Sequence, residues 1–350
     1  MNDSLLPAAA QLMGKNVGTD WLVIKKLDTP YGGTGGNFGY SYVVQNQAGA
    51  KAHLKALDFS RAMQSEDPAV ELQKLTEAYL HERFLLEECK GKRFSKIVRI
   101  IESGKISIKT FAGTYVVQFL ICEFAEGGDI RRFLNVRDTS DKWILDCLHS
   151  VAVGIQQLHS VDIAHQDIKP SNVLVFDEFV TKLGDLGRAS KRGKPIDHDQ
   201  WACAADQAYA PPEQAYDAPS SDFSIRRLTT DFYHLGSLIS FFYVQTNANS
   251  LLFNQLPPKF HPACTGESYD RLLPVLLDSF SHNITTVKEA LPDSLKDPLG
   301  TVFEYLCNPD PKLRGDPLER ISKMRRKPGI QRIISKLDLT RKREALKSSE

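Results

Sequence analysis

The segments His165-Gln-Asp-Ile-Lys-Pro-Ser-Asn172 and Gly184-Asp-Leu-Gly187 identify the architecture of this 350-residue chain. Within 19 residues they supply two carboxylates, one ammonium and one amide: Asp167, Lys169, Asn172 and Asp185. Phosphoryl transfer needs a carboxylate for the hydroxyl proton, a cation at the phosphate and oxygen ligands for magnesium. A loop between two short strands would place all of these groups around one point, so we predict a phosphoryl-transfer site here.

These segments resemble the catalytic loop and the magnesium loop of the eukaryotic-type protein kinase family, in a variant with Gln166 where an Arg is usual. The resemblance covers about residues 21–317. It implies an α+β, two-lobed protein kinase fold, with a β-rich N-terminal lobe and a mostly helical C-terminal lobe. It also implies site roles: Asp167 as catalytic base, Lys169 at the γ-phosphate of ATP, and Asn172 and Asp185 as Mg²⁺ ligands.

The hydrophobic pattern outside these segments predicts the same organisation. Residues 21–57 and 96–125 read as strands, with 96–103 as the first strand of the second group, whereas 69–88 and 141–160 read as helices. We expect the chain to be divided as follows: an N-terminal extension at 1–20, an N-lobe at 21–126, a C-lobe at 127–317 and a basic tail at 318–350.

Lys55 lies in an apolar strand pattern, where an unpaired ammonium would be costly. It therefore needs anions, namely the α- and β-phosphates and a helix carboxylate. Glu77 and Glu82 are the candidates for that carboxylate. Glu82 shares the helical face of Leu75 and Tyr79, whereas Glu77 lies on the far side, so we favour Glu82.

The segment Gly32–Gly39 stands between two predicted strands and resembles the kinase glycine-rich loop. The resemblance implies that backbone amides here cover the phosphates; the candidate nucleotide-binding residues are Gly33, Gly35, Gly36 and Gly39. The usual Val after the loop, which covers the adenine, is replaced by Ser41, which leaves Val43 and Val44 as alternatives. No Gly-Lys-Ser/Thr follows, so this is not a Walker A loop.

Further segments fit the same family. Residues 121–129 resemble the hinge, which implies that the backbone of Glu123 and Ala125 binds the adenine edge and that Asp129 meets the ribose. Residues 209–213 resemble the end of an activation segment. The family also implies two structural contacts: Glu213 with Arg314, and Asp231 with the catalytic-loop backbone.

Two further residues depart from the family pattern. Gln166 removes the cation that often grips a phosphate on the activation segment, here residues 188–213, and Ser190 is the one hydroxyl residue between 188 and 208. We therefore expect activity without phosphorylation of this segment and an unchanged rate for Ser190→Ala. Asp206 stands where a Thr is common, and either pairs with Lys169 or caps a turn at the surface.

Composition limits the class of protein. The 44 Lys and Arg residues balance 43 Asp and Glu residues, which excludes a globally basic nucleic-acid coat. Six cysteines without CxxC spacing, no span-length apolar run and no signal-peptide pattern predict a cytoplasmic protein without a membrane span. Residues 319–350 hold eleven basic and four acidic residues, which suits either a helix packed on the large lobe or an anionic partner.

The sequence thus predicts an ATP- and Mg²⁺-dependent Ser/Thr protein kinase acting on a protein hydroxyl. The Asp-Ile-Lys-Pro-Ser-Asn form of the loop favours the Ser/Thr class over tyrosine kinases. A catalytically inactive kinase-fold scaffold and a small-molecule kinase are the alternatives. Tight ATP binding without turnover would support the scaffold, and turnover on a metabolite with failure on every protein substrate would support the small-molecule kinase.

Overall fold

The computed structural model describes residues 6–27, 39–60, 62–110, 113–134, 139–177, 180–321 and 328–347. The chain divides into two compact units, each of which is described by itself. The first unit comprises residues 1–126 together with 185–187, and the second comprises 127–184 and 188–350.

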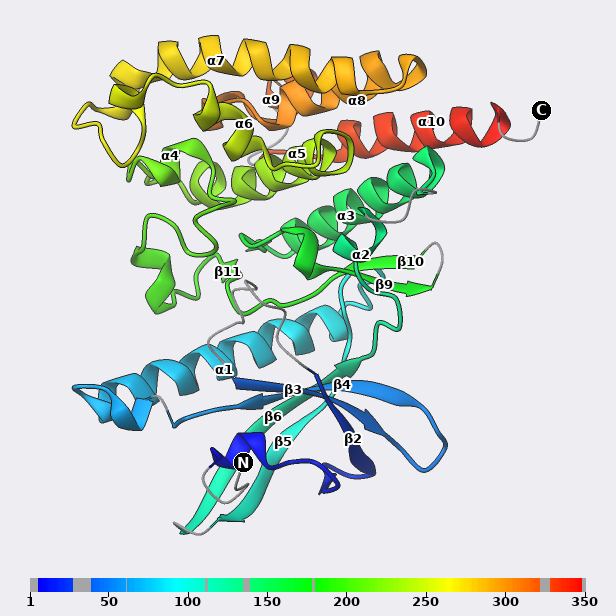
Figure 1. Ribbon diagram of the computed structural model, residues 1–350, viewed down its shortest axis with the longest axis vertical. Coiled ribbons are helices and arrows are strands. Elements are labelled where there is room, and N and C mark those ends of the chain that lie inside the picture. The colour runs from blue at the N-terminus through cyan, green and yellow to red at the C-terminus, as the bar shows by residue number, and fades with distance from the viewer. Residues whose placement is uncertain are drawn as a thin grey trace. The chain divides into compact units, whose positions relative to one another are not determined.

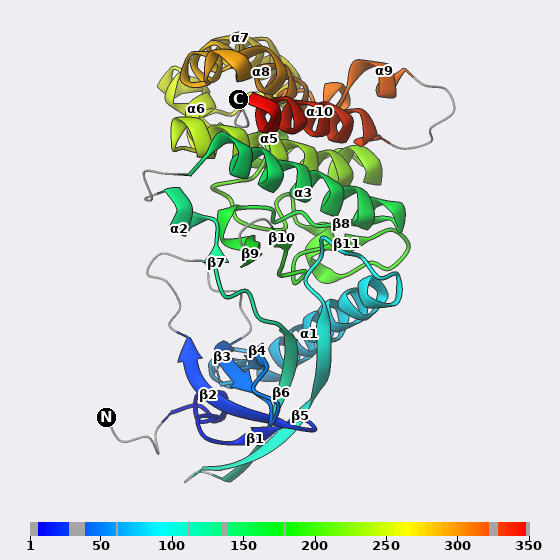
Figure 2. The same cartoon turned by 90° about the vertical axis from the view of Figure 1, so that its right-hand side faces the viewer.

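The first unit is an antiparallel sheet with one long helix (Figure 2). Its described strands follow the order β1-β2-β3-β4-β6-β5. Their bounds are β1 (Asn16–Val17), β2 (Trp21–Leu27), β3 (Gly39–Gln45), β4 (Lys51–Leu57), β5 (Ile100–Thr110) and β6 (Gly113–Glu123). Helix α1 (Pro68–Gly91) begins with Asp67 as its cap, because the Asp67 side chain accepts a hydrogen bond from the Val70 amide.

The two faces of this sheet have different roles, because successive side chains of a strand point to opposite sides. On β4, Ala52, Leu54 and Ala56 belong to an apolar core that also contains N-terminal residues such as Leu12. Lys55 lies on the opposite face. One face is thus closed by the segment before β2, and the other carries the polar groups.

The strand expected at 96–103 is displaced in the structure. β5 starts at Ile100 and runs on to Thr110, paired with β6 from Cys122 back to Gly113. The residues beyond 103 alternate between lysine or serine and isoleucine, which is the period of a half-exposed strand. Pairing with β6, and not the local density of apolar residues, determines where β5 ends.

The second unit is mostly helical, with short strands. Its helices are α2 (Arg131–Leu134), α3 (Asp141–Ser160), α4 (Pro212–Ala215), α5 (Thr229–Val244), α6 (Ala248–Asn254), α7 (Tyr269–Ala290), α8 (Asp293–Leu306), α9 (Pro317–Arg320) and α10 (Gln331–Lys347). Its strands are β7 (Gly128–Asp129), β8 (Ile163–Ala164), β9 (Val173–Asp177), β10 (Val180–Leu183) and β11 (Ser190–Lys191). β10, β9 and β7 form one small sheet, and β11 pairs with β8.

Helix α10 packs along α3 (Figures 1 and 2). Ile333, Ile334 and Leu337 are buried at this contact, and Arg341 Nη1 lies 3.0 Å from Asp146 Oδ1 on α3. The basic C-terminal segment is therefore anchored by one apolar face of its helix. None of the helices in the described ranges has the length and apolarity needed to cross a membrane.

Candidate active site

The second unit holds a compact group around Asp167, in the loop between β8 and β9. Lys169 Nζ lies 3.2 Å from Asp167 Oδ1. Asn172 Nδ2 donates to Asp167 Oδ2 at 3.0 Å and to the Asp167 carbonyl at 2.7 Å. All three residues are buried. The carboxylate is thus held by a cation on one oxygen and an amide on the other.

The backbone of this loop is fixed from beneath by Asp231 on α5. Its carboxylate accepts from the amides of His165 (2.9 Å) and Gln166 (2.7 Å) and from His159 Nε2 (2.8 Å). Burial alone would raise the pKa of Asp231, but its hydrogen bond to His159, the nearby charges of His159 and His165 and the Gln166 amide together outweigh burial and lower it. Gln166 is thereby held at φ +64°, a left-handed conformation that non-glycine residues rarely adopt. The expected bracing role of Asp231 is confirmed.

Asp206 serves both of the roles that the sequence left open. Its Oδ2 lies 3.1 Å from Lys169 Nζ, and its Oδ1 accepts from the Ala208 amide at 3.0 Å. Lys169 is therefore placed between two carboxylates, those of Asp167 and Asp206. Such an arrangement holds the ammonium group at one place.

The first unit holds a second group, centred on Lys55 of β4. Lys55 Nζ lies 3.0 Å from both carboxylate oxygens of Glu82 on α1 and 3.1 Å from Asp185 Oδ1. Burial tends to lower the pKa of Lys55, but the two carboxylates outweigh burial and raise it, so the lysine stays protonated. Glu77, the alternative partner, bonds to Gln73 on the exposed side of α1 instead.

Asp185 reaches this cation from an unusual backbone conformation. Its φ is +58°, and its Oδ1 also accepts from the Gly187 amide at 3.3 Å. Its side chain is 39% exposed, against 5% for Glu82. The Asp185 side chain is thus much more accessible to solvent than that of the enclosed Glu82.

The residues expected to hold Mg²⁺ are chemically suited to it. Mg²⁺ takes hard oxygen ligands and is usually bound through one or two protein carboxylates plus phosphates and water. Asp185 offers a partly exposed carboxylate, and Asn172 offers a side-chain carbonyl oxygen while its amide nitrogen donates to Asp167. Among the described residues no three or more His, Cys, Asp or Glu side chains could hold a metal together.

The strand register distinguishes Val43 from Val44, the two alternatives for the residue that covers the adenine. Val43 pairs with His53 across β3 and β4, so it shares the sheet face of Lys55, whereas Val44 lies in the core on the opposite face. His53 was missed in the sequence analysis, although its two-residue spacing from Lys55 places it on that face. Burial, followed by Lys55, lowers the pKa of His53 to about 4.

The expected nucleotide-binding glycines are only partly visible. Gly33, Gly35 and Gly36 lie outside the described residues. Gly39 opens β3 at φ +117°, where a Cβ atom would lie 2.2 Å from the Ala56 carbonyl oxygen. Only glycine fits this position.

The expected hinge residues follow the end of β6. The Glu123 amide donates to the Arg99 carbonyl at 3.0 Å, so any contact of its backbone with a base must come from its carbonyl. Ala125 lies in the loop that follows. Asp129 is clasped by Arg131, with Nε and Nη2 each 2.8 Å from a carboxylate oxygen, and a ribose hydroxyl would have to share that carboxylate.

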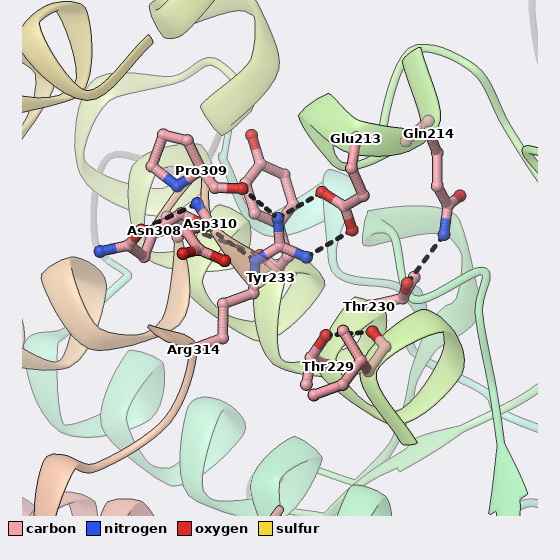
Figure 3. A network of polar contacts seen from close by, with 12 residues as sticks. Glu213, Gln214, Thr229, Thr230, Tyr233, Asn308, Pro309, Asp310 and Arg314 are labelled. Atoms are coloured by element: carbon pink, nitrogen blue, oxygen red, sulfur yellow. Dashed lines mark hydrogen bonds and ion pairs between the residues drawn. The ribbon is translucent and has the colours of Figure 1, made fainter. Parts of the chain in front are cut away.

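The expected contact between Glu213 and Arg314 is confirmed (Figure 3). Arg314 Nη1 and Nη2 lie 2.7 Å and 2.5 Å from the two Glu213 oxygens, and Nε donates to the Asn308 carbonyl at 2.8 Å. The guanidinium also lies over the Tyr233 ring. This pair closes the end of the activation segment onto the helices.

Comparison with known proteins assigns the family. Residues 33–259 match the protein kinase domain family, so this chain belongs to it and the predicted two-lobed kinase fold is confirmed. The chain is 29% identical to the mitosis inhibitor protein kinase wee1 of Schizosaccharomyces pombe over 188 residues, 48% of this chain and 20% of that protein.

Two further relatives show the same kinship. The inhibitor of nuclear factor kappa-B kinase subunit alpha of Gallus gallus is 27% identical over 165 residues, 45% of this chain and 20% of that protein. The serine/threonine-protein kinase SBK1 of Danio rerio is 42% identical over 52 residues, 14% of each chain. The matches thus span a fifth or less of each of these relatives' length.

Proposed function

We propose that this chain is a serine/threonine protein kinase that transfers the γ-phosphate of ATP to a protein hydroxyl with the help of Mg²⁺. The observation that carries the proposal is the buried Asp167 carboxylate, held between Lys169 and Asn172. A carboxylate held this way is suited to orient an attacking hydroxyl and accept its proton, while the lysine meets the transferring phosphate.

The other residues support this role. Lys55, kept charged by Glu82 and Asp185, is suited to hold the α- and β-phosphates of ATP. Asp185 and Asn172 would hold Mg²⁺, which supplies positive charge against the triphosphate. Gly39, Glu123, Ala125 and Asp129 would serve the nucleotide in the roles that the family implies.

The test is transfer of label from γ-labelled ATP in the presence of Mg²⁺, to the chain itself and to a generic basic protein. Wild type is compared with Asp167→Asn and with Asp278→Asn, a carboxylate on the exposed side of α7. We expect label on Ser or Thr that disappears only in Asp167→Asn. Nucleotide binding without any transfer would favour the scaffold, and transfer to a metabolite alone would favour the small-molecule kinase.

We also propose that this activity does not require phosphorylation of the activation segment. Gln166 carries no charge for a phosphate, and Ser190 is fully buried, out of reach of a modifying enzyme. Protein stripped by a phosphatase, and verified as unmodified by mass spectrometry, is expected to keep its full rate. A rate that falls with dephosphorylation and returns with rephosphorylation between 188 and 213 would contradict this.

A further inference from the structure

A buried polar network joins the activation segment to the catalytic loop at Gln166. The Gln166 side-chain amide nitrogen donates to the Arg188 carbonyl at 3.0 Å and to Ser190 Oγ at 2.5 Å, and its oxygen accepts from Arg227 Nη1 at 2.5 Å. Gln166, Ser190 and Arg227 are each no more than 2% exposed. The uncharged glutamine thus uses both ends of its amide on groups of this network.

Asp199 closes the network from the activation segment. Its Oδ1 accepts from Ser190 Oγ and lies 3.6 Å from Arg227 Nη2, which also donates to the Asp199 carbonyl at 2.7 Å. Its Oδ2 accepts from the Ile196 amide at 3.0 Å and so caps the short helical turn at Asp197–Gln200. One carboxylate therefore binds the buried cation, the buried hydroxyl and the segment's own backbone.

The positive charge of Arg227 in this network is balanced by a carboxylate of the chain itself, without a phosphate. Burial, followed by repulsion from Arg226, lowers the pKa of Arg227 to about 10, which leaves it protonated at neutral pH. A buried guanidinium needs a hydrogen-bonded anion, because an unpaired one is strongly destabilising. Asp199 supplies that anion from within the segment.

We propose that Arg227 and Asp199 are positioning residues that fix the activation segment to the catalytic loop through Gln166 and Ser190. They do the work of a phosphate and its cation with two side chains of the chain itself. The expected effect on KM rests on the proposed kinase function, whereas the expected effect on the position of the activation segment does not. It also replaces the expectation that Ser190→Ala leaves the rate unchanged, since that change removes the hydroxyl that links Gln166 to Asp199.

The test uses Asp199→Asn, which keeps the shape of the side chain but removes its charge, and the more severe Arg227→Met. Asp197→Asn, in the same helical turn, is the matched control. Hydrogen exchange of the amides of residues 196–201, measured without nucleotide or substrate, reports the position of the segment even if the chain proves inactive. We expect exchange there to accelerate at least about tenfold in both variants and not in the control.

The kinetic measurement separates positioning from general stability. We expect KM for the protein substrate to rise roughly 10- to 100-fold in Asp199→Asn, with KM for ATP unchanged. The double variant Asp199→Asn/Arg227→Met is expected to be no worse than Arg227→Met alone, because both changes break one network. Wild-type exchange and an unchanged KM in Asp199→Asn would overturn the proposal, as would equal losses for both substrates with a lowered melting temperature.

Discussion

Two groups of paired charges, one enclosed in the second unit and one partly exposed in the first, show how similar chemistry serves different purposes. Arg314 and Glu213 are both almost completely enclosed, and every nitrogen of the guanidinium faces an oxygen. Lys55 faces Glu82 and Asp185, but it is 20% exposed and Asp185 is 39% exposed. The first pair has no room for another partner, whereas the second has an accessible cation and carboxylate. Accessibility, and not the presence of the ion pair, distinguishes the site from the scaffold.

The largest effect is expected from breaking the closed pair. Arg314→Met leaves Glu213 as a buried charge without its partner, and we expect a loss of about 3–5 kcal/mol in the free energy of unfolding. Denaturant unfolding followed by circular dichroism measures it. The double variant Arg314→Met/Glu213→Leu removes both charges and is expected to regain much of the loss. A single variant as stable as wild type would show that the pair contributes nothing.

Breaking the open pair is expected to affect activity more than stability. Removing one preorganised charge from a phosphate site commonly costs roughly 10²–10³-fold in rate, and we expect that loss for Lys55→Met. Stability should fall less than in Arg314→Met, because water reaches the Asp185 side chain. Lys51→Met, on the exposed end of β4, is the matched control and should keep the wild-type rate. A Lys55→Met variant that transfers phosphate at the wild-type rate would remove Lys55 from the site.

The sequence predicts the open pair better than its surroundings. Helical spacing alone selected Glu82 over Glu77, because residues three and four apart share a helix face. The same rule says nothing about Arg227 and Asp199, which lie 28 residues apart in two separate short helical turns and meet only in the folded unit. Contacts within a regular element follow from its period, whereas contacts between distant segments depend on the tertiary fold.

The strands of the first unit were predicted from the sequence, apart from the displaced position of β5. β2, β3 and β4 begin or end close to where the apolar alternation indicated, since each has a buried face. β5 was placed too early because Ile97 and Val98 are buried without being in a strand. An apolar residue in the sequence indicates burial, but it belongs to a strand only where its backbone pairs with a neighbouring strand.

The lowered pKa values of two histidines, one in each unit, give a second comparison, which depends on pH. Burial lowers the pKa of His234, on α5, to about 4, although Asp231 opposes the shift. Below its ordinary value of 6.5 the unfolded chain binds a proton that the folded chain does not, so stability falls as the pH drops from 6.5 towards 4. We expect His234 to account for about 2 kcal/mol of the stability lost between pH 7 and pH 5.

Unfolding of His234→Gln at both pH values measures this contribution. The difference between pH 7 and pH 5 should shrink by that amount relative to wild type, whereas His282→Gln, at an exposed site on α7, should leave it unchanged. His53 has a similarly lowered pKa, but it lies on the open face of β4 with Lys55. A bound nucleotide should therefore alter the titration of His53 and not that of His234, which NMR of the imidazole protons would resolve.

The smallest effect is expected from an ion pair on the solvent-exposed surface of α1. Glu71 and Lys74 lie 2.8 Å apart on α1, the helix that also carries Glu82, and their side chains are 41% and 46% exposed. Because water screens such a pair, Glu71→Gln should change the free energy of unfolding by less than about 0.5 kcal/mol and leave the rate unaltered. The distance is shorter than that between Lys55 and Glu82, yet the expected effect is far smaller. A loss as large as that of Arg314→Met would show that distance, and not enclosure, sets the strength of ion pairs in this chain.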